Sequence, residues 1–219
     1  MQPTYLPWVG YFQLMSAVDI FIVLDNVQFS KRSWQQRNKI KTKNGLKWLT
    51  VPVISKGKRN QLIFEVEIDY NNKFPYNHIS IIKENYHKAP HFDQFSEIIF
   101  NTLNKNHKYL SKLTIELISL IKDILQIKTT IKLSSEFKLP GTKDELLANL
   151  CHEVGASEYV SAPGSKVYLS DSKYFKTLDI NINYFDYNVI NYNQLHGDFV
   201  SHVSVIDYLF NCNNHKNIF

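Results

Sequence analysis

Basic side chains are concentrated in one stretch of the sequence, and their neighbours suit them to ligand binding. The segment 31–59 contains ten of the 25 Lys and Arg residues and no acidic residue. Two tryptophans, Trp34 and Trp48, and several amide side chains lie among these cations. Planar hydrogen-bond donors beside cations suit an anionic ligand that carries a ring, such as a nucleotide or a nucleotide-sugar. The side chains predicted to hold its phosphates are Arg37, Asn38, Lys39 and Lys41.

The cationic segment also fits a solvated surface or a nucleic-acid partner. Residues 1–60 carry ten basic and two acidic side chains, against fifteen and eighteen in the remainder of the chain. A charge run of this kind is often only a solvated face. It would also attract an extended nucleic acid, whose binding weakens steeply with salt because each neutralised phosphate releases counterions.

The opening segment combines polar aromatic residues with prolines that stiffen it. Gln2 and Tyr5 offer hydrogen-bonding groups, and a helix that begins just after Pro7 would present free backbone N–H groups to an anion. We therefore predict substrate-binding roles for Gln2 and Gly10 and a catalytic role for Tyr5. The alternative is that this segment packs its aromatic rings into the core, which is the favoured interpretation of Trp8 and Phe12.

Five further residues are candidates for the chemistry. Asp25 ends an apolar run and could act as a general base toward an amine, with Gln28 nearby, although Asp25 could instead cap the following turn. His202 is the best isolated base, which makes it the third catalytic candidate beside Asp25 and Tyr5. Ser161 precedes a Pro-Gly turn and could bind a ligand. Asp207 lies in an apolar stretch, where an acid is often a buried structural partner, and it is a second-tier substrate-binding candidate.

Several function classes are disfavoured by what the sequence lacks. The eight His and two Cys form no HExxH or paired CxxC pattern, so no metal site is predicted. Walker A, GxGxxG and GxSxG motifs are absent, which argues against dinucleotide oxidoreductases and lipase-like hydrolases. No apolar run approaches the roughly 18–20 residues of a membrane-spanning helix, and no secretory signal is present. We expect a cytoplasmic protein without membrane insertion.

Hydrophobic periodicity predicts alternating strands and helices. Helices are expected after Pro7, over 92–103 and 110–126, and from Thr142 to Gly155, with Thr142 and Glu145 at capping-box spacing. Strands are expected over 19–24, 46–54, 62–69, 129–137, 158–161 and 178–185. This alternation favours an α/β fold, a Rossmann-like three-layer sandwich with a mainly parallel sheet. We predict one domain over 1–219, with a mostly helical insertion or subdomain around 75–127.

Six runs of the sequence match a known pattern. They are QPTYLPWVGYF at 2–12, DIFIVLDNVQF at 19–29, WQQRNKIK at 34–41, WLTVPV at 48–53, YVSAPGS at 159–165 and SVIDYLFN at 204–211. In these runs the chain resembles the WbqC-like protein family over nearly its whole length. Members usually carry a short apolar strand before the Gln-Pro motif, and this chain begins inside that pattern.

The resemblance implies a function in bacterial surface-polysaccharide (O-antigen) biosynthesis, where a glycine-transferring role on an amino sugar has been proposed for members. The corresponding hypothesis is a transferase that forms an amide between an activated small acid, with glycine as the example, and a nucleotide-linked amino sugar. ATP or another nucleotide would then be the cofactor that activates the acid. The alternatives are a non-catalytic module that binds nucleotides or nucleic acid, and an assembly partner in polysaccharide synthesis.

Overall fold

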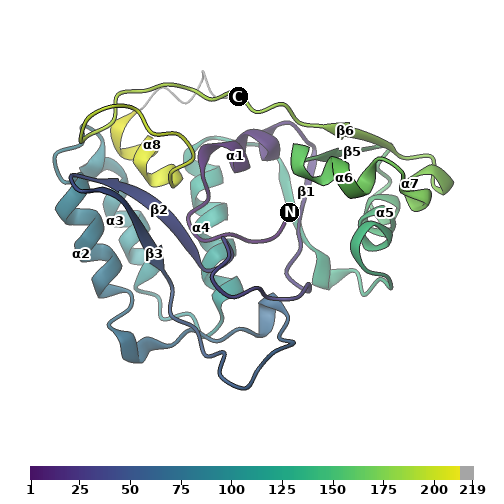
Figure 1. The fold of residues 1–219 in the computed structure, drawn as a ribbon, viewed down its shortest axis with the longest axis horizontal. Helices are drawn as coiled ribbons and strands as arrows, with labels where there is room; N and C mark the ends of the chain where they lie inside the picture. The colour runs from purple at the N-terminus through teal and green to yellow at the C-terminus, as the bar shows by residue number, and fades with distance from the viewer. Residues whose placement is uncertain (213–219) are drawn as a thin grey trace.

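Helices and short strands alternate along residues 1–212, the part of the chain that the computed structural model describes (Figure 1). The α-helices are α1 (Val9–Ser16), α2 (Tyr76–Tyr86), α3 (Phe92–Leu103), α4 (Leu110–Ile124), α5 (Lys143–Glu153), α6 (Lys166–Leu169), α7 (Lys173–Thr177) and α8 (Val205–Asn211). The strands are β1 (Ile20–Val23), β2 (Arg37–Thr42), β3 (Gly45–Thr50), β4 (Thr130–Leu133), β5 (Glu158–Ser161) and β6 (Asn181–Tyr184). Short 3-10 turns are η1 (Ile63–Glu65), η2 (Tyr70–Asn72), η3 (Ser134–Glu136) and η4 (Pro163–Ser165). The predicted mixed α/β class is confirmed.

The strands of residues 1–212 form two-stranded sheets, whereas the predicted three-layer sandwich requires one larger sheet. β1 runs parallel to β4, β5 runs parallel to β6, and β2 and β3 form an antiparallel hairpin. Two of the three sheets are therefore parallel, as expected for strands linked by helices. Because each sheet in residues 1–212 has only two strands, a Rossmann-like three-layer sandwich is not confirmed.

The hairpin places the cationic segment on a regular surface. Arg37 pairs with Thr50 and Lys39 with Trp48, so these side chains alternate with the buried Asn38 and Ile40. The sequence predicted a strand over 46–54 but not its partner β2, because a strand rich in Lys and Arg lacks the expected apolar alternation. Figure 1 shows the hairpin running from the tip beside α2 toward the centre of the molecule.

Two local predictions are wrong. Residues 62–69 form the turn η1 and isolated bridges instead of a strand, with Ile63 buried and Phe64 exposed. Thr142 does precede α5, but its side chain makes no capping hydrogen bond, so the predicted capping box is not formed. The predicted strand 129–137 is shortened to β4, because η3 follows it directly.

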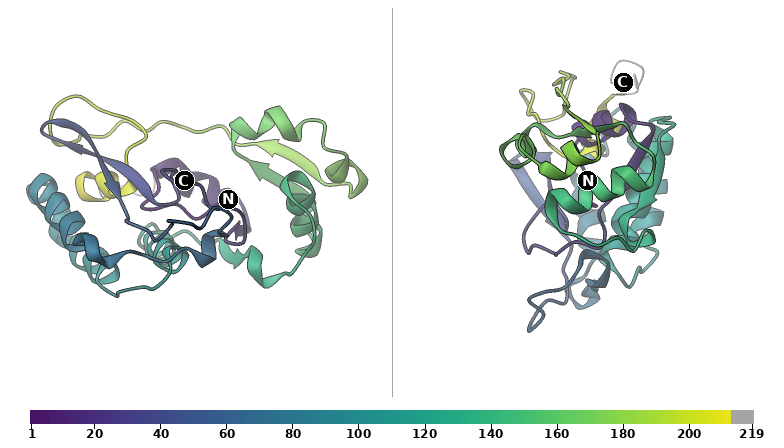
Figure 2. Two further views of the ribbon diagram at one scale, coloured as in Figure 1. Left: turned by 60° about the horizontal axis from the view of Figure 1, so that its bottom comes forward. Right: turned by 90° about the vertical axis from the view of Figure 1, so that its right-hand side faces the viewer.

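Within residues 1–212, buried apolar side chains form two separate clusters. The main cluster contains residues of α1, α2, α3, α4, α8, β1 and the hairpin. Three of these helices, α2, α3 and α4, belong to the predicted insertion. The smaller cluster contains Ala148, Cys151, Leu169, Phe175 and Ile180. It lies in a small lobe built from α5, α6, α7, β5 and β6, which Figure 2 shows standing to one side of the main body. The description as one domain with an insertion at 75–127 stays a prediction.

The chain between β6 and α8 connects this small lobe to the main body. It runs as an extended segment over the top of the molecule in Figure 1. No helix in residues 1–212 is long and apolar enough to cross a membrane.

Candidate functional site

The opening segment and the cationic segment lie side by side. The backbone N–H of Tyr5 donates to the carbonyl of Trp34 at 3.0 Å, and the Gln35 amide donates to the Gln2 side chain at 2.9 Å. Asn38 donates from its buried side chain to the carbonyl of Leu6 at 2.6 Å. The motif at 204–211 joins them, because Ser204 also donates to the Leu6 carbonyl, at 2.9 Å. Motifs far apart in the sequence therefore share one region.

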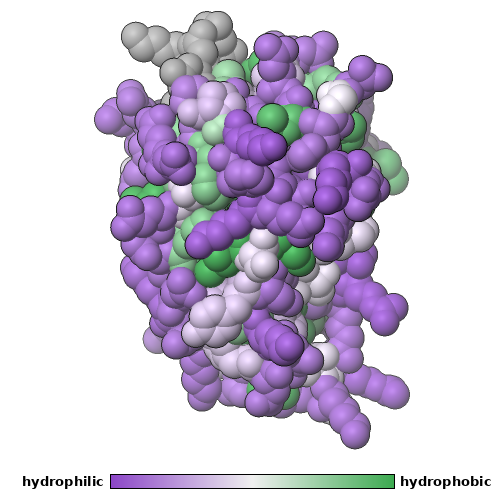
Figure 3. All heavy atoms as spheres, turned by 90° about the vertical axis from the view of Figure 1, so that its left-hand side faces the viewer, coloured by the Kyte–Doolittle hydropathy of each residue, from purple (hydrophilic) through white to green (hydrophobic). Residues whose placement is uncertain are grey.

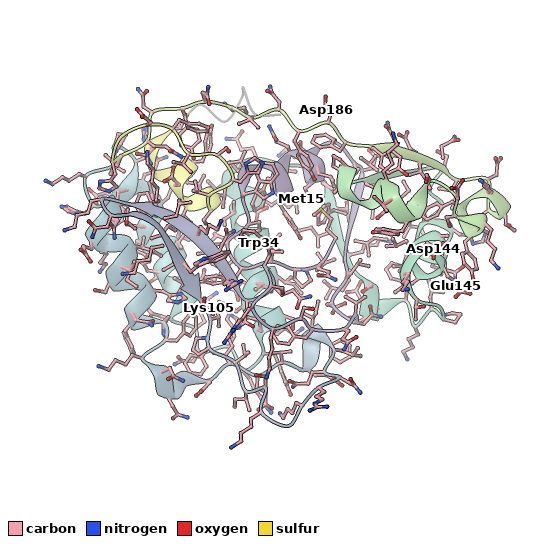
Figure 4. All side chains as sticks on the ribbon, in the orientation of Figure 1. Met15, Trp34, Lys105, Asp144, Glu145 and Asp186 are labelled. Carbon is pink, nitrogen blue, oxygen red and sulfur yellow. The ribbon has the colours of Figure 1, made fainter. Side chains whose placement is uncertain are left out.

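Four side chains of the hairpin region form a partly exposed surface, which we call the cation–aromatic face: Trp34, Arg37, Lys39 and Trp48. The Arg37 guanidinium lies 4.2 Å from the centre of the Trp48 ring, and the Lys39 ammonium lies 5.0 Å from the same ring and 5.9 Å from that of Trp34. The two indoles are 48% and 39% exposed, and their centres are 5.3 Å apart. Figure 4 labels Trp34 near the base of the hairpin.

The cations of this face are free to meet an anion. Within residues 1–212 no carboxylate forms an ion pair with Arg37 or Lys39. The Arg37 Nε is buried, and no group in that part of the chain accepts its hydrogen bond. A cation over an aromatic ring is held in place while its remaining N–H groups stay available. Figure 3 shows the neighbouring side of the molecule, with α2 and the hairpin tip, as largely hydrophilic around a band of apolar side chains.

The other two residues of the predicted phosphate clamp are used inside the protein. Lys41 is buried, and its ammonium donates to the carbonyls of Gly197 and Asp198. Asn38 holds the Leu6 carbonyl, as described above. Both residues thus fix the segments around the face, and their role in ligand binding stays a prediction.

Asp25 follows β1 at its carboxyl end, as predicted, where the adjacent strand β4 also ends. Its buried carboxylate accepts hydrogen bonds from the Ser135 backbone N–H at 3.0 Å and from the Ser135 hydroxyl at 2.7 Å. Asp25 therefore caps the distant turn η3, whereas the alternative foresaw a cap on the turn that directly follows Asp25. A base at this position would first have to exchange these bonds, so its catalytic role stays a prediction. Gln28 is exposed three residues further on.

Tyr5 is fully buried, and its hydroxyl lies 2.9 Å from Nδ1 of His78. The other ring nitrogen of His78 lies 3.1 Å from the carbonyl of Thr50, which can only accept, so Nε2 carries the proton and Tyr5 donates to Nδ1. Burial lowers the pKa of His78 to about 4. His78 thus joins the opening segment to the end of β3. Sequence reasoning missed it, because a single His without a metal-ligand pattern gives no signal.

His78 is expected to make the protein sensitive to acid. Its pKa is about 4 in the folded protein, against an ordinary value of 6.5, so the unfolded chain binds more protons between these two values. Stability should therefore fall as pH falls from 6.5 toward 4, by up to about 3 kcal/mol from this group. Urea unfolding of the wild type and His78→Gln at pH 7 and at about pH 4.5 measures it. The variant should lose less stability on acidification, and equal losses in the two proteins would contradict the assignment.

Asp207 is fully buried in α8, and two tyrosines hold its carboxylate. The hydroxyl of Tyr86 donates to it at 2.6 Å and that of Tyr192 at 2.8 Å. Burial raises the pKa of Asp207, while the donated hydrogen bonds oppose that rise. Gln194 donates to the Tyr192 hydroxyl and to the carbonyl of Val200, which extends the network into the segment above α8. The geometry fits the structural partner foreseen as the alternative, and a substrate contact stays a prediction.

Gly10 and His202 both lie against the Trp8 ring. A Cβ on Gly10 would come within 2.1 Å of that ring, so only glycine leaves room for it. The imidazole of exposed His202 stacks on the Trp8 ring, with ring centres 4.4 Å apart. Beside them lies a cavity of about 30 Å³, lined in part by Trp8, Tyr192 and His202, which is large enough for a water molecule. Ligand binding by Gly10 and catalysis by His202 stay predictions.

Gly10→Ala is expected to destabilise the protein by about 1–3 kcal/mol, as overpacking does. The gain in helix propensity, about 1 kcal/mol at most, is too small to offset a contact of 2.1 Å with the Trp8 ring. Thermal or urea unfolding measures the change. Gly164→Ala is the matched control, because a Cβ there meets nothing within 4 Å. A difference of less than about 0.5 kcal/mol between the two variants would refute the packing role of Gly10.

Ser161 ends β5 in the small lobe, and its buried hydroxyl lies 2.6 Å from that of Ser165. It is therefore on a different group of elements from the hairpin, and its ligand contact stays a prediction. Among residues 1–212, no group of three or more His, Cys, Asp or Glu side chains has a geometry that could hold a metal ion.

The fold and site together describe a mixed α/β protein in which a proline-rich opening segment is bonded to an exposed cation–aromatic hairpin. The chain belongs to the WbqC-like protein family, whose model matches residues 2–218, so the resemblance seen in the sequence is confirmed. An uncharacterized protein of Mycobacterium tuberculosis, Rv1507c, is 40% identical over 213 residues, which cover 96% of this chain and 91% of that protein. No solved structure matches the chain.

Proposed function

We propose that the protein is a cytoplasmic transferase that binds a nucleotide-linked amino sugar at the cation–aromatic face and joins an activated small acid to its amine. The observation that carries the binding step is that Arg37 and Lys39 lie over the exposed rings of Trp48 and Trp34 without a carboxylate partner in residues 1–212. Indole rings can stack on a nucleobase while guanidinium and ammonium groups hold the diphosphate. The acyl transfer rests on the family resemblance, which points to polysaccharide biosynthesis and to glycine.

The proposed reaction needs an activated acid and a base. The amine nitrogen attacks the acyl carbon, a C–N bond forms, the bond to the leaving group breaks, and the amine loses a proton. If ATP activates the acid, pyrophosphate leaves when the acyl-adenylate forms and AMP leaves when the amide forms. Asp25, at the carboxyl end of β1, is the proposed base, with Gln2 and Gln28 beside the amine.

Transfer is tested by incubating the protein with a UDP- or dTDP-linked amino sugar, glycine and ATP, and then measuring the mass of the conjugate. Lys39→Met should reduce its yield at least about tenfold, because it removes a charge-assisted contact to the phosphates. Lys47→Met is the matched control, because Lys47 is the next residue along β3 from Trp48 and so points away from the face. If neither ATP nor another acyl donor, including charged tRNA, gives a product, the transferase proposal fails.

The acid-free segment also favours a second candidate, a nucleic-acid surface, because Lys56, Lys58 and Arg59 extend the positive charge beyond the face. Affinity for single-stranded RNA or DNA would then fall steeply between about 50 and 200 mM salt. The slope of log affinity against log salt would be roughly proportional to the number of phosphates that the protein neutralises. Affinity for a mononucleotide that changes little with salt would favour the transferase.

A further inference from the structure

A second group of polar side chains lies in the small lobe, where β5 and β6 end together. Ser161 and Tyr184, the last residues of these parallel strands, are paired in register. The turn that follows β5 satisfies its own hydroxyl groups, since Ser165 donates to the carbonyl of Ala162 at 2.6 Å and lies 2.6 Å from Ser161 Oγ. Ligands of parallel sheets commonly lie beyond such strand ends.

The hydroxyl of Tyr184 is buried, and no group in residues 1–212 forms a hydrogen bond with it. Burying a hydroxyl without a partner costs free energy, so such a group needs an explanation. The ammonium of Lys166 lies 5.8 Å from the centre of the Tyr184 ring and has no carboxylate partner in the same range. A buried O–H donor and an unpaired cation therefore lie together.

Tyr168 and Asp144 complete the surroundings. Tyr168 is 57% exposed on α6, next to Val167, which is 92% exposed, so this side of the lobe is open to solvent. Burial, and after it the carboxylate of Asp144, raises the pKa of Tyr168, so its hydroxyl stays protonated and can donate at neutral pH. The carboxylate of Asp144, labelled in Figure 4, already accepts the hydroxyl of Ser172 at 2.7 Å.

We propose that Lys166, Tyr184 and Tyr168 form a binding site for a small oxyanion, a phosphate or carboxylate group, at the carboxyl ends of β5 and β6. The ammonium supplies the charge, and the two hydroxyls donate to the anion. This site is on a different lobe from the cation–aromatic face and does not depend on the transferase proposal. Phosphate and carboxylate share this recognition chemistry, and the two arms of the test separate them.

Nuclear magnetic resonance of protein labelled at the tyrosine rings tests the site. Inorganic phosphate and, separately, acetate are titrated at constant ionic strength, and the Tyr184 signal is assigned through Tyr184→Phe. We expect a saturable shift of the Tyr168 and Tyr184 signals with at least one of the two anions. Lys166→Met should weaken the binding at least about tenfold, because it removes the cation of the site. A response to phosphate alone identifies a phosphorylated ligand, and a response to acetate identifies a carboxylate.

Lys173→Met is the matched control, because Lys173 is an exposed lysine of the same lobe that lies over the ring of Tyr174 at 5.2 Å. It should bind the anion as the wild type does. Arg37→Met should show the same anion-induced shifts of the Tyr168 and Tyr184 signals as the wild type. That result would separate this site from the hairpin. Shifts that never saturate with either anion, or equal affinities in Lys166→Met and Lys173→Met, would overturn the proposal.

Discussion

Asp207→Ala is expected to lower the free energy of unfolding by at least about 3 kcal/mol. The substitution leaves the buried hydroxyl of Tyr86 and the partly buried hydroxyl of Tyr192 without their acceptor, and an unsatisfied buried donor costs about 1–3 kcal/mol. It also leaves a cavity in α8, where the side chain is fully buried. Removing a buried charge works in the opposite direction, since burial raises the pKa of Asp207, but two lost hydrogen bonds outweigh it.

The measurement is urea unfolding of the wild type, Asp207→Ala and Asp171→Ala. Asp171 is the control, because its side chain is 98% exposed and its ion pair with the Lys176 ammonium spans 3.9 Å. Its loss should change stability by less than about 0.5 kcal/mol. Asp207→Asn keeps an acceptor for one tyrosine and should lie between the two. Equal stabilities of the two alanine variants would show that the network does not support the fold.

The elements that the sequence predicted well depend on local patterns. The buried strand β1 and the helices α3 and α4 follow apolar periodicities that each segment shows on its own, even though β1 pairs with the distant strand β4. The hairpin strand β2 and the irregular segment 62–69 were mispredicted because tertiary contacts override the pattern. β2 tolerates its basic residues because Arg37 and Lys39 lie on indole rings and Lys41 donates to backbone carbonyls.

In the candidate site, too, local features can be predicted from the sequence, whereas tertiary contacts cannot. The cationic segment and the opening segment can be identified from composition and spacing, and the structure places them side by side. The partners of the buried groups could not be found this way. Tyr5 meets a histidine 73 residues away, and Asp207 meets Tyr86 across 121 residues. Nothing in the local sequence of one residue indicates its distant partner. These polar networks therefore become visible only in the folded structure.

Arg37→Met is expected to weaken the binding of a mononucleotide such as UDP or dTDP at least about tenfold. Methionine keeps the apolar contact with Trp48 but removes the guanidinium, whose charge-assisted hydrogen bonds to phosphate contribute about 1.5–3 kcal/mol. Trp48→Leu removes the ring that would stack on the base and should cost about 1–3 kcal/mol. Isothermal titration calorimetry at fixed ionic strength measures both affinities.

Arg59→Met is the matched control for this prediction. Arg59 belongs to the same acid-free segment and is exposed, but it is not among the residues of the cation–aromatic face. If the face binds the nucleotide through defined contacts, removing Arg59 should change the affinity by less than about twofold, because an exposed charge is screened by water and salt. Similar losses in Arg37→Met and Arg59→Met would instead indicate a diffuse attraction of anions to the whole segment. The face would then act as a general cationic surface, and the nucleic-acid candidate would replace the transferase.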